Sequence, residues 1–166
     1  MAELKDSGTR RNFETGAARD CAEGKGRCDL LPLGVIGEYL LDPILLLIEN
    51  YVRSGDCADL FTALERFGKE QYGTMLKGGC IYDVLLEAAK QYEDGIQKYG
   101  DRNWEKGIPL HCFIDSATRH YLKHKRGDVD EPHDRAFAWN MLGAIWTHKN
   151  KPELIDLPFA EKENAV

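Results

Sequence analysis

The sequence contains no long apolar segment. Its longest uninterrupted apolar run, Ile44–Ile48, is far shorter than the roughly 20 residues that a membrane-spanning helix needs. The first residues, MAELKDSGTRRNF, contain no apolar stretch of the kind found at the centre of a signal peptide. We therefore expect a cytoplasmic protein without a membrane partner.

Positive charge is also scarce. The chain has 22 lysines and arginines against 28 acidic residues, which gives a formal net charge of −6. Proteins that bind nucleic acids generally carry a basic surface or a dense basic stripe, and neither is visible here. We expect no stable binding to DNA or RNA.

Cysteine chemistry and several catalytic motifs are absent as well. The five cysteines are an odd number and include no CxxC pair, which disfavours both a disulfide framework and a cysteine zinc site. The chain has no GxxxxGK[ST] phosphate loop, no GxSxG nucleophile elbow and no dinucleotide-binding glycine motif. The glycine-rich segment around Lys25 can still offer backbone N–H groups and positive charge to a phosphate.

What is present is an ordinary globular composition with helical periodicity. The 166 residues are 43% hydrophobic and 30% charged, enough to form one domain with its own core. Strand-like alternation never persists for more than a few residues, so we predict an all-α fold, a helical bundle. Residues 1–31, rich in glycine, arginine and aspartate, are predicted to form an extended basic arm.

Capping residues mark the helix boundaries. Aspartate followed by proline starts a helix well, because the carboxylate accepts from free N–H groups and proline needs no hydrogen bond in the first turn. Glycine commonly follows a helix end. On these grounds we predict a helix over 43–52 after Asp42, one over 56–67 before Gly68 and one over 80–99 before Gly100. Two more helices are predicted within 109–146. The RGDVDEP loop separates them, and the second starts at Pro132.

Glu93 is the unusual polar residue of the 80–99 helix. A carboxylate that faces a helix bundle is costly unless it is paired or binds a metal ion. Position alone favours a functional and a structural role for Glu93 equally. At about 100° per residue, it falls at the edge of the apolar arc formed by Ile81, Leu85, Ala88, Tyr92 and Ile96.

Polar side chains also gather on one side of the helix that precedes the RGDVDEP loop. Asp115, Arg119 and His120 lie opposite an apolar stripe, and the Asp115–Arg119 spacing is typical of a surface ion pair. His120 and His124 are four residues apart, a spacing that can hold zinc. No glutamate follows His120 and no third ligand is evident, so a zinc site is not favoured.

The last helix carries two polar groups on one face. His133 and Asn140 are seven residues apart and nearly superposed, with Ala136, Gly143 and Ala144 beside them. Small residues around polar groups indicate either a concavity that admits a ligand or close packing between helices.

Two further segments have two interpretations each. Glu131 and Asp134 spell ExxD, a pattern that several metal-dependent nucleotide hydrolases use, although acids at a helix start also complement its dipole. Trp104, between Asn103 and Lys106 in a glycine-bounded loop, can offer an aromatic platform to a nucleobase or plug the end of the bundle.

Four motifs together resemble a known family. EGKGRCDLLP, KYGDRNWEKGIP, IDSATRHYLK and GDVDEPHDRAFAWN, in that order, look like the dATP/dGTP diphosphohydrolase N-terminal-domain family of phages and prophages. The resemblance covers residues 19–32 and roughly 85–146, and it is specific because the separated motifs recur in order. Residues 33–79 carry none of the motifs and look like a helical insertion, ahead of a motif-bearing core at 80–149, within a single domain of 1–166.

The resemblance implies an all-α enzyme, more distantly similar to the MazG-type nucleoside triphosphate pyrophosphatases, which bind Mg²⁺ through carboxylates on a helix bundle. The implied reaction cleaves a deoxypurine triphosphate such as dATP or dGTP between its α- and β-phosphates and releases the monophosphate and pyrophosphate. We also expect a homo-oligomer. One departure is clear, because the MazG-type pattern has ExxE on one helix, whereas Lys90 stands three residues before Glu93 here.

Position and resemblance together assign each candidate residue a role. Carboxylates would hold one or two Mg²⁺ ions, or Mn²⁺, and histidines would act as a general base or a further ligand. Basic side chains would neutralise phosphates, and the tryptophan and asparagines would bind the base. The expected metal ligands are Glu93, Asp115, Asp130 and Asp134, the expected catalytic residues are Glu93, His120 and His133, and the expected substrate-binding residues are Lys25, Arg27, Lys98, Asn103, Trp104, Arg119 and Asn140.

A second class of function stays open. A non-catalytic helical module of phage or prophage origin could bind a nucleotide or a protein, with Glu93, His133 and Asn140 forming a satisfied hydrogen-bond network. This alternative predicts binding that does not depend on Mg²⁺.

Overall fold

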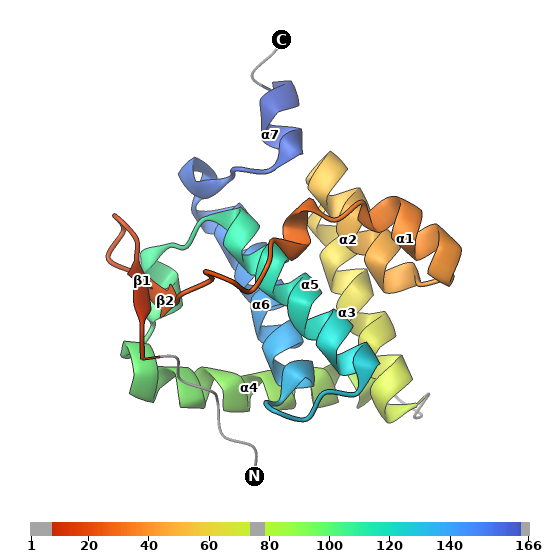
Figure 1. Cartoon of the computed structure of the whole chain (residues 1–166), viewed down its shortest axis with the longest axis horizontal. Coiled ribbons are helices and arrows are strands. Elements are labelled where there is room, and N and C mark those ends of the chain that lie inside the picture. Colours follow the sequence, from red (N-terminus) through yellow and green to blue (C-terminus); the bar gives the residue numbers. More distant parts are fainter. Residues whose placement is uncertain (1–7, 74–78, 164–166) are drawn as a thin grey trace.

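The fold is built almost entirely from helices. The computed structural model describes residues 8–73 and 79–163, so residues 1–7 of the predicted arm and 74–78 of the predicted insertion lie outside the described residues. Seven α-helices and one two-stranded sheet in the described ranges confirm the all-α class. Along the chain of Figure 1 the elements are β1 (Arg10–Asn12), β2 (Ala18–Asp20), η1 (Cys28–Leu30), α1 (Leu33–Leu40), α2 (Pro43–Ser54), α3 (Cys57–Tyr72), α4 (Gly79–Tyr99), η2 (Asn103–Lys106), α5 (Leu110–Arg126), α6 (His133–Asn150), η3 (Pro152–Leu154) and α7 (Pro158–Glu163).

Aspartate side chains cap the starts of α2 and α3, as predicted. Asp42 accepts hydrogen bonds from the backbone N–H groups of Ile44 and Leu45 at 3.0 and 3.2 Å. Asp56 accepts from the N–H of Ala58 at 2.9 Å. These bonds satisfy donors that the first turn of a helix otherwise leaves free, which is why a polar residue at this position is informative in a sequence.

The predicted end of α3 before Gly68 is wrong, because α3 continues to Tyr72. Gly68 serves packing instead. A Cβ atom at this position would lie 2.7 Å from the carbonyl oxygen of Cys80 and 2.9 Å from a methyl carbon of Val84. The missing side chain lets α3 and α4 approach closely, a role that local sequence does not separate from helix capping.

One hydrophobic core joins all seven helices. In Figure 1, α5 and α6 run side by side at its centre, α4 packs across α6, and α1–α3 lie on the other side. The ring of Phe67 in α3 packs 4.8 Å from that of Phe137 in α6, measured between centroids. Helices α1–α3 therefore share the core of the remaining chain, while the predicted limits of the insertion stay a prediction. Within the described ranges, we find no helix with the length and apolar character needed to span a bilayer.

The N-terminal arm is more ordered than predicted, because it contains the antiparallel hairpin β1–β2, which pairs Arg11 with Arg19. Three-residue strands are too short to show alternation in a sequence. Tertiary contacts hold them instead, since the Asn103 side chain accepts from the Ala18 N–H at 2.9 Å and donates to the Ala18 carbonyl at 2.8 Å. The arm then crosses α5, where the Cys28 N–H donates to Asp115 at 2.6 Å.

An ion pair ties the segment after α6 to the start of α5. His111 contacts the Asp156 carboxylate through Nδ1, and its backbone N–H donates to the same carboxylate at 2.9 Å. The hydrogen bond to Asp156 is the main cause that raises the pKa of His111 from 6.5 to about 10. Because the folded state holds the proton more tightly, the pair stabilises the fold below the unfolded pKa and loses this effect as the pH rises to the folded pKa.

We expect His111→Asn to destabilise the protein by about 1 kcal/mol at pH 6, a value held low by solvent screening of the exposed pair. The difference from the wild type should fade between about pH 6.5 and 10, as the wild-type imidazole loses its proton. Urea unfolding of both proteins at several pH values measures this. An equal difference across the whole range would contradict the assignment.

Candidate functional site

A polar cavity of about 570 Å³ lies where the N-terminal arm faces α4, α5 and the start of α6. β2 and the loop after it form one wall, and the C-terminal half of α4 forms another. Eight of the residues that line it are charged. The cations are Arg19, Lys25, Lys98, Arg119 and Lys123, and the carboxylates are Asp20, Asp130 and Glu131.

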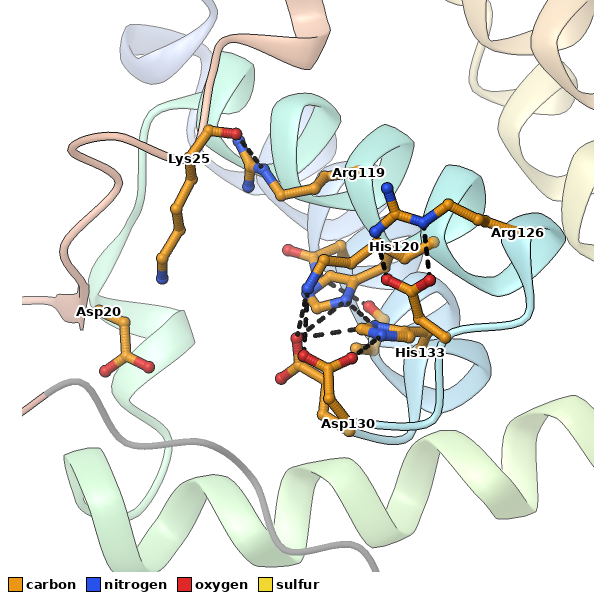
Figure 2. Close-up of polar contacts among 12 residues, drawn as sticks. Asp20, Lys25, Arg119, His120, Arg126, Asp130 and His133 are labelled. Atoms are coloured by element: carbon orange, nitrogen blue, oxygen red, sulfur yellow. Dashed lines mark hydrogen bonds and ion pairs between the residues drawn. The ribbon is translucent and has the colours of Figure 1, made fainter.

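Lysines reach the cavity from three elements. Figure 2 shows the Lys25 side chain extending from the arm toward Asp20, across from Asp130 and the histidines. The Lys98 Nζ atom lies 3.9 Å from a carboxylate oxygen of Asp20, and the Lys123 Nζ atom lies 3.5 Å from one of Asp130. Positive charge thus converges from the arm, α4 and α5, an arrangement suited to a polyanion such as a phosphate chain.

Arg19 supplies a buried positive charge at the base of this cavity. Its Nη2 atom donates to the Asn140 side-chain oxygen at 2.6 Å, and its guanidinium carbon lies 5.0 and 5.4 Å from the ring centroids of Phe113 and Trp139. Its Nη1 atom is buried and has no hydrogen-bond partner among the described residues. Burial lowers the pKa of Arg19 from its usual value. A buried donor of this kind gains strongly from an anionic acceptor.

Arg119 is bonded to the N-terminal arm and to Asp115 as well as lining the cavity. Its guanidinium pairs with Asp115 and donates to the carbonyl of Gly26 at 2.9 Å. Asp115 is buried, and its second oxygen accepts from the Cys28 N–H. Arg119 still lines the cavity, but these bonds mainly fasten the arm across α5 and so position Lys25.

A compact cluster of histidines and carboxylates forms the wall opposite the arm. The Nδ1 atoms of His120 and His133 lie 3.0 Å apart. The Glu131 Oε1 atom is 3.7 Å from the first and 3.6 Å from the second. On the far side of the His133 ring, Nε2 lies 2.8 Å from an Asp130 oxygen. α5 and α6 thus bring the two histidines that the sequence singled out within 3.0 Å of each other.

Burial keeps His120 neutral. Desolvation is the main cause that lowers its pKa from 6.5 to about 3, and the nearby His133 acts in the same direction. At neutral pH the His120 imidazole is therefore unprotonated. A neutral ring with so low a pKa is a weak base, and it is better suited to accept a hydrogen bond or bind a metal ion than to hold a proton.

The carboxylates predicted to bind Mg²⁺ are not brought together. Glu93 is exposed, because the buried face of α4 includes Val84, and a residue nine positions later lies about half a turn away around the helix. Asp115 is occupied by the arm, and Asp134 does not line the cavity. Asp130 alone of the predicted ligands reaches the site. The predicted set of Mg²⁺ ligands is therefore not assembled as a whole, although two other carboxylates, Asp20 and Glu131, line the cavity with Asp130.

Three predicted substrate-binding residues are engaged with the protein itself. Arg27 forms a bidentate pair with Asp29, at 2.6 and 2.7 Å, and does not line the cavity. Asn103 holds β2 through Ala18. Asn140 lines the cavity, but its oxygen accepts from Arg19, and its nitrogen donates to a carbonyl of its own helix at 2.7 Å. Both asparagines position the arm.

A second cavity, of about 210 Å³, adjoins the first and is aromatic. Trp104 lines it, with its ring 5.5 Å from Tyr92 and 5.0 Å from Trp146 between centroids. The two cavities share lining residues, including Tyr99 and Trp139. Trp104 therefore lines an aromatic cavity that borders the charged one.

Sequence reasoning missed three residues of this site. Arg19, Lys123 and Glu131 all line the cavity, but none was among the predicted site residues. Glu131 was visible as the first residue of the ExxD motif, whose second acid, Asp134, does not line the cavity. Arg19 had no local pattern, since a single arginine in an irregular arm shows its burial only after folding.

A family model matches the chain from the middle of α3 to the segment after η3. The model described as dATP/dGTP diphosphohydrolase, N-terminal, matches residues 65–157, more than half of the sequence. The matched range includes the histidine cluster and leaves out the arm. Comparisons with curated proteins and with solved structures found no match. The chain therefore belongs to the dATP/dGTP diphosphohydrolase N-terminal family.

Proposed function

We propose that this protein hydrolyses deoxypurine nucleoside triphosphates of the dATP and dGTP type to the monophosphate and pyrophosphate. The observation that carries the proposal is the 570 Å³ cavity, in which five cations face three carboxylates. Its volume falls within the range of small-molecule sites, and its excess of positive charge suits a triphosphate. The family description names the same class of substrate.

The aromatic cavity is the proposed site of the base. Its lining includes the rings of Tyr92, Trp104 and Trp139, and its volume of about 210 Å³ can hold a purine. Aromatic rings stack on nucleobases with modest sequence preference, which favours a flat base in this compartment. Tyr99 lines both cavities, so a nucleotide with its base in the aromatic cavity and its phosphates near the lysines of the charged cavity would have its sugar beside Tyr99.

Positioning and neutralisation of charge dominate phosphoanhydride hydrolysis. The water oxygen bonds to the α-phosphorus, and the bond between the α-phosphorus and the α,β-bridging oxygen breaks. That oxygen leaves with pyrophosphate, and one proton is released to solvent. Arg19, Lys25 and Lys98 would bind the phosphate oxygens and stabilise the charge on the leaving group. Dependence on a divalent cation, Mg²⁺ or Mn²⁺, is part of the proposal.

The direct experiment supplies each of the four deoxynucleoside triphosphates with Mg²⁺, with Mn²⁺ or with EDTA. We expect pyrophosphate and monophosphate from the purine substrates, and ¹⁸O from labelled water in the monophosphate. Release of orthophosphate, or no turnover of any purine triphosphate, would contradict the proposal.

Trp104→Ala should weaken binding of dGTP about tenfold or more, because stacking on one base contributes roughly 1–3 kcal/mol. Binding of inorganic tripolyphosphate, which has no base, should be unchanged. Calorimetric titration with both ligands measures this difference. Tyr39→Ala, at an exposed position on α1, is the matched control and should bind both ligands like the wild type. Equal losses for both ligands in Trp104→Ala would place the base elsewhere.

A non-catalytic binding module is the second candidate. The hydrogen bonds that join Asp130, His133 and His120 favour it, because a network that satisfies its own members can be structural. It predicts saturable nucleotide binding with no pyrophosphate release. Assembly into a homo-oligomer is also proposed, and sedimentation equilibrium of the purified chain tests it.

A further inference from the structure

The wall of the cavity that carries His120, Glu131 and His133 has the geometry of a metal site. The three donor atoms, two Nδ1 and one Oε1, lie 3.0, 3.6 and 3.7 Å from one another. Ligands about 2.1 Å from one ion lie about 3.0 Å apart at a right angle and about 3.4 Å apart at a tetrahedral angle. One ion can therefore reach all three atoms with little rearrangement.

The orientation of His133 is held by a neighbour in the way that metal-binding histidines usually are. Its Nε2 atom lies 2.8 Å from an Asp130 oxygen, so the ring donates its N–H there and turns the Nδ1 lone pair toward His120 and Glu131. The His133 side chain is 1% exposed, so its ring is fixed by packing as well.

Glu131 adds a carboxylate to the two imidazole rings and lies within reach of both without a short hydrogen bond to either. Its Oε1 atom lies 3.6–3.8 Å from both imidazoles and from the Lys123 Nζ atom, beyond ordinary hydrogen-bond length. His120 and Glu131 line the 570 Å³ cavity, so an ion has a path from solvent. The ammonium of Lys123 can move toward Asp130, which it already approaches at 3.5 Å.

We propose that His120, Glu131 and His133 bind one divalent transition-metal ion, with Co²⁺ or Zn²⁺ preferred over Mg²⁺. Two imidazole nitrogens and one carboxylate suit ions of intermediate softness, whereas Mg²⁺ requires oxygen ligands. The three protein ligands leave further positions for water or a ligand from the cavity, as in catalytic rather than structural sites. The inference does not depend on nucleotide hydrolysis.

The test titrates Co²⁺ into EDTA-treated full-length protein and records visible absorption, without any nucleotide. We expect saturable binding at one ion per chain, displacement by Zn²⁺, and no displacement by a 100-fold excess of Mg²⁺. Melting temperature with and without Zn²⁺ gives a second readout, which should rise with the metal.

Variants locate the ion. His120→Asn and Glu131→Gln should weaken Co²⁺ binding by 100-fold or more, and Asp130→Asn by about 10–100-fold, because it only orients His133. His124→Asn is the matched control, one turn further along α5 and outside the cluster, and should bind like the wild type. Circular dichroism of each variant establishes that it is folded.

Absence of stoichiometric Co²⁺ or Zn²⁺ binding, or binding that survives His120→Asn and Glu131→Gln, would overturn the inference and leave a hydrogen-bonded network only. Displacement by Mg²⁺ at similar concentration would overturn the stated preference. Metal binding without turnover of any nucleotide would contradict the proposed hydrolysis while supporting the metal site, so the two failures are distinguishable.

Discussion

Replacing Arg19 with methionine is expected to lower kcat/KM for dGTP by about 100-fold or more while leaving the melting temperature unchanged or slightly higher. The loss follows because the guanidinium is the buried donor at the base of the cavity, and removing one such donor typically costs about 10²–10³ in rate. Stability is retained because methionine can pack against Phe113 and Trp139, and because Asn140, which loses its Arg19 donor, lines the cavity and can accept a hydrogen bond from water there.

Arg27→Met is the matched control for this substitution. Arg27 lies in the same arm and also forms a close side-chain hydrogen bond, but its partner is Asp29 and it does not line the cavity. Kinetics, calorimetric binding of tripolyphosphate and thermal unfolding of both variants make the comparison. If Arg27→Met lost as much activity as Arg19→Met, the charged cavity would not be the phosphate site.

Gly143→Ala is expected to destabilise the protein by about 2 kcal/mol, a fall in Tm of roughly 4–8 °C. A Cβ atom at this position would lie 2.8 and 2.9 Å from two ring carbons of Phe113. The ring is fully buried between α5 and α6 and also lies under the Arg19 guanidinium. The added methyl group must therefore displace either a helix or the Phe113 ring that contacts the Arg19 guanidinium.

Gly95→Ala provides the opposite case. Gly95 lies within α4, and a Cβ atom there would meet nothing within 4 Å. Alanine has the higher helix propensity, so this variant should gain up to about 1 kcal/mol. Thermal and urea unfolding measure both variants. Equal stabilities of Gly143→Ala and the wild type would mean that α5 and α6 are not packed as closely as the structure has them.

The helices were largely predictable because their information is local. Asp42 caps α2 through hydrogen bonds to residues two and three positions later, so the pattern and its physical cause lie in one stretch of sequence. The end of α3 was wrong for the opposite reason. The backbone of Cys80, in the next helix, lies so close to Gly68 that a side chain at this position would collide with it. In the sequence, a glycine that permits close packing looks the same as one that ends a helix.

Sequence reasoning placed His133 and Asn140 of α6 and Lys98 of α4 near the cavity, but it misplaced Glu93 of α4. His133 and Asn140 share one face over two turns, and helical geometry alone was enough to bring them to the cavity region. The expectation that Glu93 faces the bundle was wrong because the apolar arc of α4 is wide. Exposed apolar residues such as Leu86 and Ile96 belong to this arc, so the sequence does not show which part of it is buried. Which residue of an arc faces the core depends on the neighbouring helix.

The amino-acid sequence by itself determined the helical class, most helix boundaries and the family, because periodicity, capping and motif order are local properties of the chain. Only the tertiary structure decided which charges meet. Arg19 and His133 are 114 positions apart in the sequence, and their places at one cavity follow from the arm crossing α5 and from the packing of α5 on α6. Electrostatic contacts form through space, so the functional arrangement exists only once the core has fixed those elements.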